Sequence, residues 1–511
     1  MQTLYYNAAI RSMKPGQALF EAMAVADGVV VALGRGSELD ALTRQGYRPV
    51  DLGGACVLPG FIDCHAHLLM SGVMGISCDL AGAAFFEELF ERLSQWRAAK
   101  PGESVFGFRF DDQATPEQRM PTRQELDRVV PDVPALVMHA TCHRCSVNTR
   151  GLEHFALPEG LPGLDLDQGN PTGVVRDPGI LTHVFPVLFG SVSQDLAEQA
   201  FQHAAGAALA AGVTTVQALE GGDFTPGGTQ KLALCREALP IRTVLWNQSI
   251  RVEEARELGL PRAGGCICAD GELDARTAAL FEPYADDPNN RGDLYYTREA
   301  MDAFVWTAHS QGMQITVHCE AERAIEQVLS AIETAQDRMP RPDARHRIEH
   351  VELPTLDQIE RMGRAGIIAS VQPAFIPAFI AGENLPRMER LFGPARARML
   401  HPYRTMRERG LVLCGGSDSP VTPFAPLTGV AAMCGHVYPE QSIGVEEALA
   451  AFTRDAAWGV FEEQRLGTLE PGKRADFVVL SADPCAIDPE SIASIQIRQV
   501  YRNGELVLQK S

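Results

Sequence analysis

Short apolar runs alternate with amphipathic stretches from about residue 197 to residue 455. Each apolar run ends in Gly, His, Gln or Asp, and this alternation is typical of repeated strand–helix units. With an earlier run at residues 57–63, the predicted strands are residues 213–216, 241–246, 266–269, 314–318, 346–350, 367–372 and 411–414. The predicted helices are residues 198–211, 298–311, 322–336, 356–365 and 395–409, with Thr297 as the N-cap of the second.

Eight buried parallel strands separated by helices predict an α/β fold, a (β/α)8 TIM barrel spanning residues 57–465. An open doubly wound parallel sheet is the alternative. Residues 1–56 and 466–511 break the pattern, because they alternate strands and turns without helices. We therefore expect both termini to form one composite β-sandwich domain, with the barrel inserted between its two halves.

Residues 70–195 are too long for a single connection between a strand and a helix. They are rich in Pro and Gly, and residues 85–99 carry a helical pattern of their own. We expect this segment to be an inserted subdomain, which follows the first barrel strand and covers the barrel mouth.

The composition describes a globular chain, with 45% hydrophobic residues and a formal net charge of -20 over 511 residues. The negative charge makes nucleic acid and anionic membranes poor partners. The apolar stretch at residues 22–33 is interrupted by Asp27 and Gly28, and it is too short to cross a bilayer. Twelve scattered cysteines favour free thiols, so we expect a cytoplasmic protein. A homodimer is the default expectation for its assembly.

Polar residues that can bind a metal stand at the ends of several predicted strands. His65 and His67 follow the first run, His318 and His350 end two later strands, and Asp418 follows the last. Residues i and i+2 of a strand face the same side, so His65 and His67 would both point into the barrel mouth. Because barrel enzymes build their sites at the carboxyl ends of the strands, the five residues together predict a metal site.

A second cluster of possible zinc ligands lies at His139, Cys142, His143 and Cys145. Structural zinc sites usually draw ligands from two separated pairs, and no second Cys or His pair follows within 30 residues. A strand at residues 136–140 with buried thiols is the simpler interpretation, and it leaves His143 free to face the site.

Four motifs together carry a resemblance to the metal-dependent amidohydrolase superfamily. They are Gly-Phe-Ile-Asp-Cys-His-Ala-His at residues 60–67, the strand ends at His318 and His350, Gly-Ser-Asp-Ser-Pro at 416–420, and the tail at 467–480. Within this superfamily the chain more closely resembles the YtcJ-like branch, often called amidohydrolase family 3, which includes N-substituted formamide deformylases. The closer likeness rests on residues 121–123, 170–173, 270–271, 276–278, 322–324, 348–350 and 372–373.

The resemblance implies a barrel with a composite β-sandwich, and hydrolysis by metal-activated water. It implies that His65, His67 and Asp418 hold a first metal ion, and that His318 and His350 hold a second ion or orient the water. We expect zinc, as one or two ions, although other divalent metals are compatible. Asp418 and His350 are the expected catalytic residues, with Asp418 as the proton acceptor.

Cys266 is the main departure from the family pattern. Many relatives carry a lysine four residues before the Asp270–Gly271 pair, where it bridges two metal ions as a carbamate. A thiolate is a competent zinc ligand, so Cys266 either replaces that lysine or is a buried thiol in a one-metal enzyme. Cys268 lies two residues further along and on the same side of the strand, so the sequence does not decide which of the two thiols occupies the position of the lysine.

These features predict a hydrolase that cleaves the C–N bond of an amide, formamide or cyclic amide in a small molecule. His143, Arg176 and Gln372 are the candidate contacts to the substrate. Deamination of a heterocycle would use the same ligands. A barrel that binds a metabolite and regulates without turnover is the alternative from a different class, but it would have no chemical need for Asp418.

Overall fold

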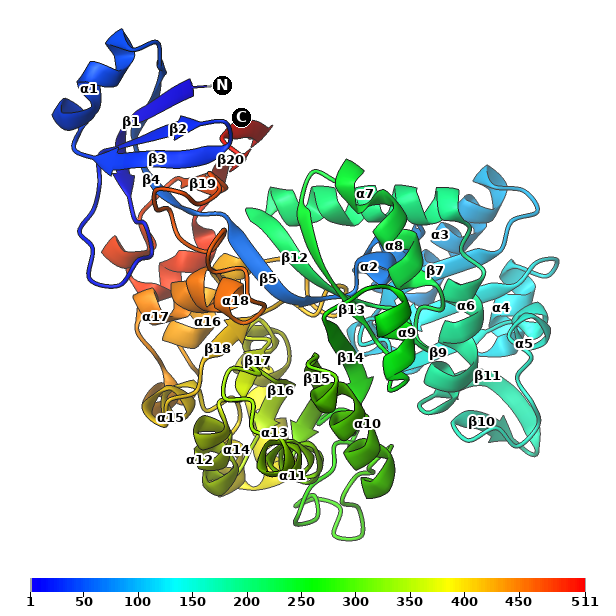
Figure 1. Cartoon of the computed structure of the whole chain (residues 1–511). Coiled ribbons are helices and arrows are strands. Elements are labelled where there is room, and N and C mark those ends of the chain that lie inside the picture. The colour runs from blue at the N-terminus through cyan, green and yellow to red at the C-terminus, as the bar shows by residue number, and fades with distance from the viewer. Residues whose placement is uncertain (1, 511) are drawn as a thin grey trace.

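Strands from both ends of the chain pair in one seven-stranded sheet in the computed structural model, which describes residues 2–510 apart from the side chains at 36, 37 and 40. The sheet contains β1 (Gln2–Ile10), β2 (Ala22–Ala26), β3 (Val29–Gly34), β4 (Arg48–Pro59), β19 (Phe477–Leu480), β20 (Ile497–Arg502) and β21 (Glu505–Gln509). Its order is β21-β20-β19-β4-β1-β2-β3, with β4 parallel to β1 and antiparallel to β19. The blue and red ribbons of Figure 1 therefore lie together.

Eight further strands run parallel in two sheets and follow one another in chain order. The first sheet holds β5 (Phe61–Ala66), β12 (Val213–Glu220) and β13 (Arg242–Asn247), and the second holds β14 (Arg262–Cys268), β15 (Gln314–Ala321), β16 (Arg347–Leu353), β17 (Ile368–Val371) and β18 (Leu413–Gly415). At their carboxyl ends the last and first strands meet, because the Asp418 amide donates to the His65 carbonyl at 2.7 Å and the His67 amide donates to the Ser419 carbonyl at 2.8 Å. Every strand predicted for the barrel overlaps one of these eight.

The helices predicted between these strands are confirmed at four places. They are α7 (Gln194–Ala210), α10 (Arg298–Ser310), α11 (Glu322–Arg338) and α12 (Leu356–Ala365). The Thr297 hydroxyl accepts a hydrogen bond from the Ala300 amide, as expected of an N-cap. Apart from α14 and α15, which are described below, the other α-helices outside the insertion are α1 (Gly36–Arg44), α2 (Leu68–Gly75), α8 (Gly228–Cys235), α9 (Val252–Glu257), α13 (Leu385–Phe392), α16 (Pro426–Cys434), α17 (Val445–Ala451) and α18 (Arg454–Trp458).

The single helix predicted over residues 395–409 is wrong. The structure has α14 (Pro394–Ala397) and α15 (Tyr403–Glu408), separated by a short non-helical segment. His401 has a φ of 50° there, and Pro402 lacks the amide that a continuous helix would need. The break lets the His401 amide donate to the Glu352 carbonyl at 2.7 Å.

The strand predicted over residues 57–63 is also corrected, because it belongs to two sheets. The chain leaves β4 at Pro59, passes Gly60 and enters β5 at Phe61. A Cβ at Gly60 would lie 2.3 Å from the Thr214 hydroxyl oxygen, so only glycine fits at this crossing. One continuous apolar run therefore links the terminal sheet to the parallel strands.

The segment after β5 contains a six-stranded sheet of its own, with the order β10-β11-β9-β8-β7-β6. Its strands are β6 (Cys78–Asp79), β7 (Val105–Phe110), β8 (Ala135–His139), β9 (Arg144–Val147), β10 (Leu164–Asp167) and β11 (Asn170–Arg176), and its helices are α3 (Phe86–Ala99), α4 (Arg123–Val129), α5 (Thr149–His154) and α6 (Phe185–Gly190). In Figure 1 these elements lie on the side of the molecule opposite the terminal sheet. None of the helices between residues 2 and 510 has both the length and the apolarity needed to cross a lipid bilayer.

Candidate metal centre

The first three predicted ligands meet where β5 and β18 end. The Nε2 atoms of His65 and His67 lie 3.2 and 3.1 Å from the same Asp418 oxygen, Oδ1. All three side chains are buried, and their ligand atoms lie within 4.8 Å of one another. We refer to His65, His67 and Asp418 as the first half-site.

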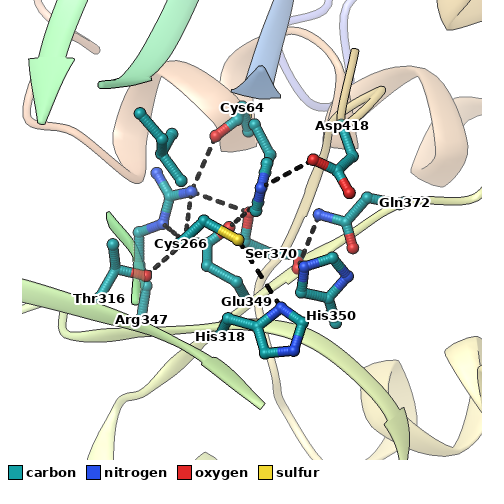
Figure 2. A network of polar contacts seen from close by, with 12 residues as sticks. Cys64, Cys266, Thr316, His318, Arg347, Glu349, His350, Ser370, Gln372 and Asp418 are labelled. Carbon is teal, nitrogen blue, oxygen red and sulfur yellow. Dashed lines mark hydrogen bonds and ion pairs between the residues drawn. The ribbon is translucent and has the colours of Figure 1, made fainter. Parts of the chain in front are cut away.

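The remaining predicted ligands come from three neighbouring parallel strands of the five-stranded sheet, β14, β15 and β16. His318 Nδ1 lies 3.7 Å from Cys266 Sγ, and the rings of His318 and His350 are 4.3 Å apart between centroids. Cys266 Sγ also lies within 4.8 Å of nitrogen atoms of His65 and His350. Figure 2 shows Cys266, His318 and His350 pointing toward a common space that Asp418 also faces. We refer to Cys266, His318 and His350 as the second half-site.

A bulge in β14 turns Cys266 into this space. Gly264 and Gly265 have φ angles of +88° and +140°, and the pairing with β15 shifts register between Gly264 and Cys268. A Cβ at Gly264 would lie 2.1 Å from the Thr316 carbonyl oxygen. Because bulges re-aim the side chains that follow them, the two glycines account for the orientation of the thiol.

Two of the predicted ligands have strained backbones. His350 has a φ of 71° and Asp418 a φ of 55°, which is the left-handed region that residues other than glycine rarely adopt. Such conformations cost about 1–3 kcal/mol each and cluster at functional sites. The strain at these two strand ends supports a functional role for both residues.

Buried partners fix the ring orientations in the first half-site. His65 Nδ1 donates to Glu349 Oε2 at 2.8 Å, and His67 Nδ1 donates to the Leu219 carbonyl at 2.9 Å. Arg347 Nε donates to the other oxygen of Glu349 at 2.9 Å, as Figure 2 shows. Burial alone would raise the pKa of Glu349, but the Arg347 guanidinium and His65 lower it to about 2. The Nε2 lone pairs of both histidines are therefore directed at the ligand space.

The residues present fit a metal ion. Four buried atoms in this space have no hydrogen-bond partner, namely His65 Nε2, Asp418 Oδ1 and both ring nitrogens of His350. Buried polar atoms without partners are costly unless a ligand satisfies them. Imidazole, carboxylate and thiolate are donors that suit a divalent transition metal. In the second half-site, His318 Nε2 donates to the Gly271 carbonyl at 3.3 Å, which leaves Nδ1 as the ligand atom.

The predicted substrate contacts lie in different surroundings. His143 lines the cavity above the ligands, and its Nδ1 lies 2.5 Å from Asp177 Oδ2. Burial alone would lower the pKa of His143, but the Asp177 carboxylate raises it to about 10. Arg176 is exposed and pairs with Asp165 at 3.0 Å, so its side chain is engaged away from the cavity. Gln372 is fully buried and donates to the Ser370 carbonyl at 3.4 Å.

Several charged residues near the ligands were not predicted from the sequence. Glu220, Arg347 and Glu349 are buried below the ligands, and the cavity wall contains the buried Glu320 and Glu352 and the half-buried Glu272 and Asp274. Charged residues inside a predicted buried strand, such as Arg347 and Glu349 in residues 346–350, could have indicated them. The cavity above the ligands has a volume of about 110 Å³.

The alternative zinc cluster is absent from the described residues around β8. His139 Nδ1 contacts the Thr141 hydroxyl at 2.8 Å, and Arg144 donates to His139 Nε2 at 3.0 Å. Both ring nitrogens are thus already engaged, and the predicted strand is confirmed as β8. Cys142 lines the cavity above the candidate ligands, whereas Cys145 is fully buried in the core.

Comparisons with known proteins point to one family. The model of the amidohydrolase family matches residues 48–508. YtcJ of Bacillus subtilis (strain 168) is 28% identical over 100% of both chains, and the N-substituted formamide deformylase of Arthrobacter pascens is 25% identical over 98% of this chain and 97% of its own. A solved structure, that of an uncharacterized metal-dependent hydrolase from Pyrococcus horikoshii OT3, is 26% identical, with a TM-score of 0.81 over 96% of this chain and 99% of that one.

Proposed function

Because the chain belongs to the amidohydrolase family, we propose that this metal-dependent hydrolase cleaves the C–N bond of an amide, formamide or cyclic amide in a small molecule. The observation that carries the proposal is the convergence of His65, His67 and Asp418, in which both histidine Nε2 atoms lie 3.1–3.2 Å from Asp418 Oδ1. A relative of nearly equal length is named as an N-substituted formamide deformylase. That name supports a C–N bond as the target.

The same proposal includes the architecture. We interpret the two parallel sheets as one (β/α)8 barrel over residues 57–465, with an inserted subdomain at about 70–195. The terminal strands would form a composite β-sandwich from residues 1–56 and 466–511. Contact between the carboxyl ends of β18 and β5 supports the closed barrel over the open sheet.

His65, His67 and Asp418 would hold a first zinc ion, and Cys266, His318 and His350 a second. Zinc supplies two effects when bound, because it lowers the pKa of water to about 7 and polarises a carbonyl. The free state of all twelve cysteines supports a reducing compartment such as the cytoplasm, in which Cys266 stays available as a thiol.

The chain's own residues would move the protons. Asp418 accepts a proton from the attacking water and returns it to the departing nitrogen, so that water oxygen joins the acyl carbon as the C–N bond breaks. His143, kept protonated by Asp177, donates a hydrogen bond to the carbonyl oxygen as negative charge develops there. In a one-metal site, His350 would orient the water instead of holding the second ion.

The replacement Asp418→Asn tests this function directly. The proton acceptor is lost, so we expect kcat for the best amide or formamide substrate to fall by about 10²–10⁴-fold while the protein stays folded. The measurement is carboxylate release by the zinc-loaded protein, with circular dichroism as the check on folding. Exposed Asp167 provides the control replacement Asp167→Asn, for which we expect the wild-type rate.

Three results would contradict the proposal. A folded Asp418→Asn protein with the wild-type rate would remove Asp418 from the mechanism. Ammonia released from a heterocycle without a new carboxylate would indicate deamination instead. Folded protein that takes up no metal when grown with zinc would favour a regulatory barrel without turnover.

A further inference from the structure

Carboxylates follow the metal ligands on two neighbouring strands of the site. On β15, Glu320 comes two residues after His318, and on β16, Glu352 comes two residues after His350. Glu272 joins them from the loop after β14. All three line the cavity above the half-sites, and we call Glu272, Glu320 and Glu352 the carboxylate layer.

The carboxylate layer lies close to the reacting centre. A carboxylate oxygen of Glu320 lies within 4.8 Å of ligand nitrogens of His318 and His350. Glu320 and Glu352 are only 3% and 4% exposed, so neither is a solvated surface charge. The cavity of about 110 Å³ is smaller than the ~150 Å³ that holds a benzene ring, so a group bound here must be compact.

The side-chain charges around the cavity do not balance. His143 lines the cavity and pairs with Asp177, and Asp274, which also lines it, pairs with Arg387. Glu352 pairs with His401 through one oxygen, at 3.3 Å, and its other oxygen lies 3.7 Å from His350 Nδ1. Among the described residues, neither Glu272 nor Glu320 has a cationic side chain in ion-pair contact, and both accept hydrogen bonds only from the backbone, Glu320 from the Leu273 amide at 2.7 Å and Glu272 from the Ala275 amide at 2.8 Å.

Unpartnered atoms in the same wall point to a ligand. Glu352 Oε1 is buried and accepts no hydrogen bond, and it lies 3.7 Å from His350 Nδ1, which is in ion-pair range but too far for a hydrogen bond. Glu352 and His350 both line the cavity. A buried carboxylate oxygen without a donor is costly, and a bound N–H donor would satisfy it.

We propose that the carboxylate layer binds a cationic group of the substrate, an ammonium or a guanidinium, a few bonds from the scissile C–N bond. This inference rests on the proposed function and names its substrate class as small amides that carry a positive charge. Guanidinium and ammonium groups donate several hydrogen bonds to carboxylates, and such charge-assisted bonds are about twice as strong as neutral ones.

Pairs of cationic and neutral substrates of similar size test the preference. Glycinamide is compared with propionamide for a charge on the acyl side, and N-(2-aminoethyl)formamide with N-propylformamide for a charge on the nitrogen side. We expect kcat/KM to be about 10- to 100-fold higher for the cationic member of one pair. The isosteric replacements Glu272→Gln and Glu320→Gln should remove that preference. The control Glu282→Gln changes an exposed glutamate and should retain it.

A binding measurement separates this proposal from the proposed function. We expect methylguanidinium to bind the zinc-loaded protein at least tenfold more tightly than neutral methylurea, by calorimetry, and Glu272→Gln to abolish the difference. If methylguanidinium binds in this way but no amide is hydrolysed, the hydrolase function fails and the cation site stands. If amides are hydrolysed without charge preference and both ligands bind equally, the cation site is overturned. Metal loss from Glu320→Gln with the preference retained would also overturn it, because Glu320 would then be a metal ligand.

Discussion

The two half-sites of the candidate metal centre differ in how firmly their residues are held. In the first, the Nδ1 atoms of His65 and His67 each donate a hydrogen bond to a buried acceptor at 2.8–2.9 Å. In the second, His318 donates at 3.3 Å, and neither nitrogen of His350 makes a hydrogen bond, since Glu352 Oε1 is 3.7 Å from its Nδ1. Partners of this kind fix the tautomer and the ring plane of a ligand histidine.

This difference leads us to expect that the two half-sites bind metal ions with different affinities. The first half-site is organised before any ion arrives, because the buried Arg347–Glu349 pair orients His65. The second half-site must complete its geometry around the ion, with the Cys266 thiol between the two positions. We expect the first ion to bind tightly and the second to depend on the thiol.

The largest effect is expected from Glu349→Gln, which breaks the support of the first half-site. Removing one partner of a buried ion pair leaves Arg347 uncompensated, so the free energy of unfolding should fall by about 3–5 kcal/mol. Affinity for the first ion should fall by about 10- to 100-fold. Denaturant unfolding and competition with a chelator measure the two effects. Unchanged metal affinity in the folded variant would remove the distinction between the half-sites.

A smaller and more selective effect is expected from Cys266→Ser. The hydroxyl is a poorer ligand than a thiolate, so the metal content should fall from two ions per chain to one while the first ion remains. Elemental analysis of purified protein counts the ions, and Cys434→Ser, on α16, is the matched control. Retention of both ions would show that the thiol is not a ligand, and loss of both would show that the half-sites are not independent.

The smallest effect concerns how the free energy of unfolding depends on pH, because buried carboxyl groups near the two half-sites contribute with opposite signs. Beside the second, burial raises the pKa of Asp270 from 3.8 to about 7, although backbone amides such as that of Ala279 oppose the shift. The folded protein therefore holds a proton that the unfolded chain releases, and this contribution to stability is present below pH 3.8 and lost as the pH rises to about 7. Near the first, the pKa of Glu349 is lowered to about 2, so its contribution is lost as the pH falls below 4.5.

The replacement Asp270→Asn isolates this contribution. In metal-free protein, the wild type should lose more free energy of unfolding between pH 4 and pH 7 than the variant does. Denaturant unfolding at the two pH values measures the difference, with Asp167→Asn as the exposed control. Identical slopes in wild type and Asp270→Asn would show that the carboxyl near the second half-site is not protonated in the folded protein.

The candidate ligands could be predicted because each stands where an apolar run ends. The carboxyl ends of parallel strands lie at the same edge of a sheet. The local pattern and the strand direction are therefore enough to predict that His65, His318, His350 and Asp418 lie together. The caps were equally local, as at Thr297. The local sequence pattern is therefore sufficient to predict the residues at the strand ends.

The residues that could not be predicted depend on distant neighbours. Glu349 supports His65 from 284 positions away in the sequence, and nothing in the run around Glu349 indicates that contact. The break at Gly60 depends on the Thr214 side chain, which crowds the chain where two sheets meet. The carboxylate layer was missed for a similar reason, because only the fold shows which acids face the same cavity.

The seven-stranded sheet has a consequence for how the protein is made. β4 needs β19 as its neighbour, yet about four hundred residues separate them in the chain. At roughly 5–20 residues per second, the ribosome takes about 20 to 80 seconds to deliver the missing strands. Throughout that interval one edge of β4 waits without its partner, and Asp418 also emerges late. The nascent chain therefore carries an unpaired strand edge, which is prone to misassembly, until its last strands are made.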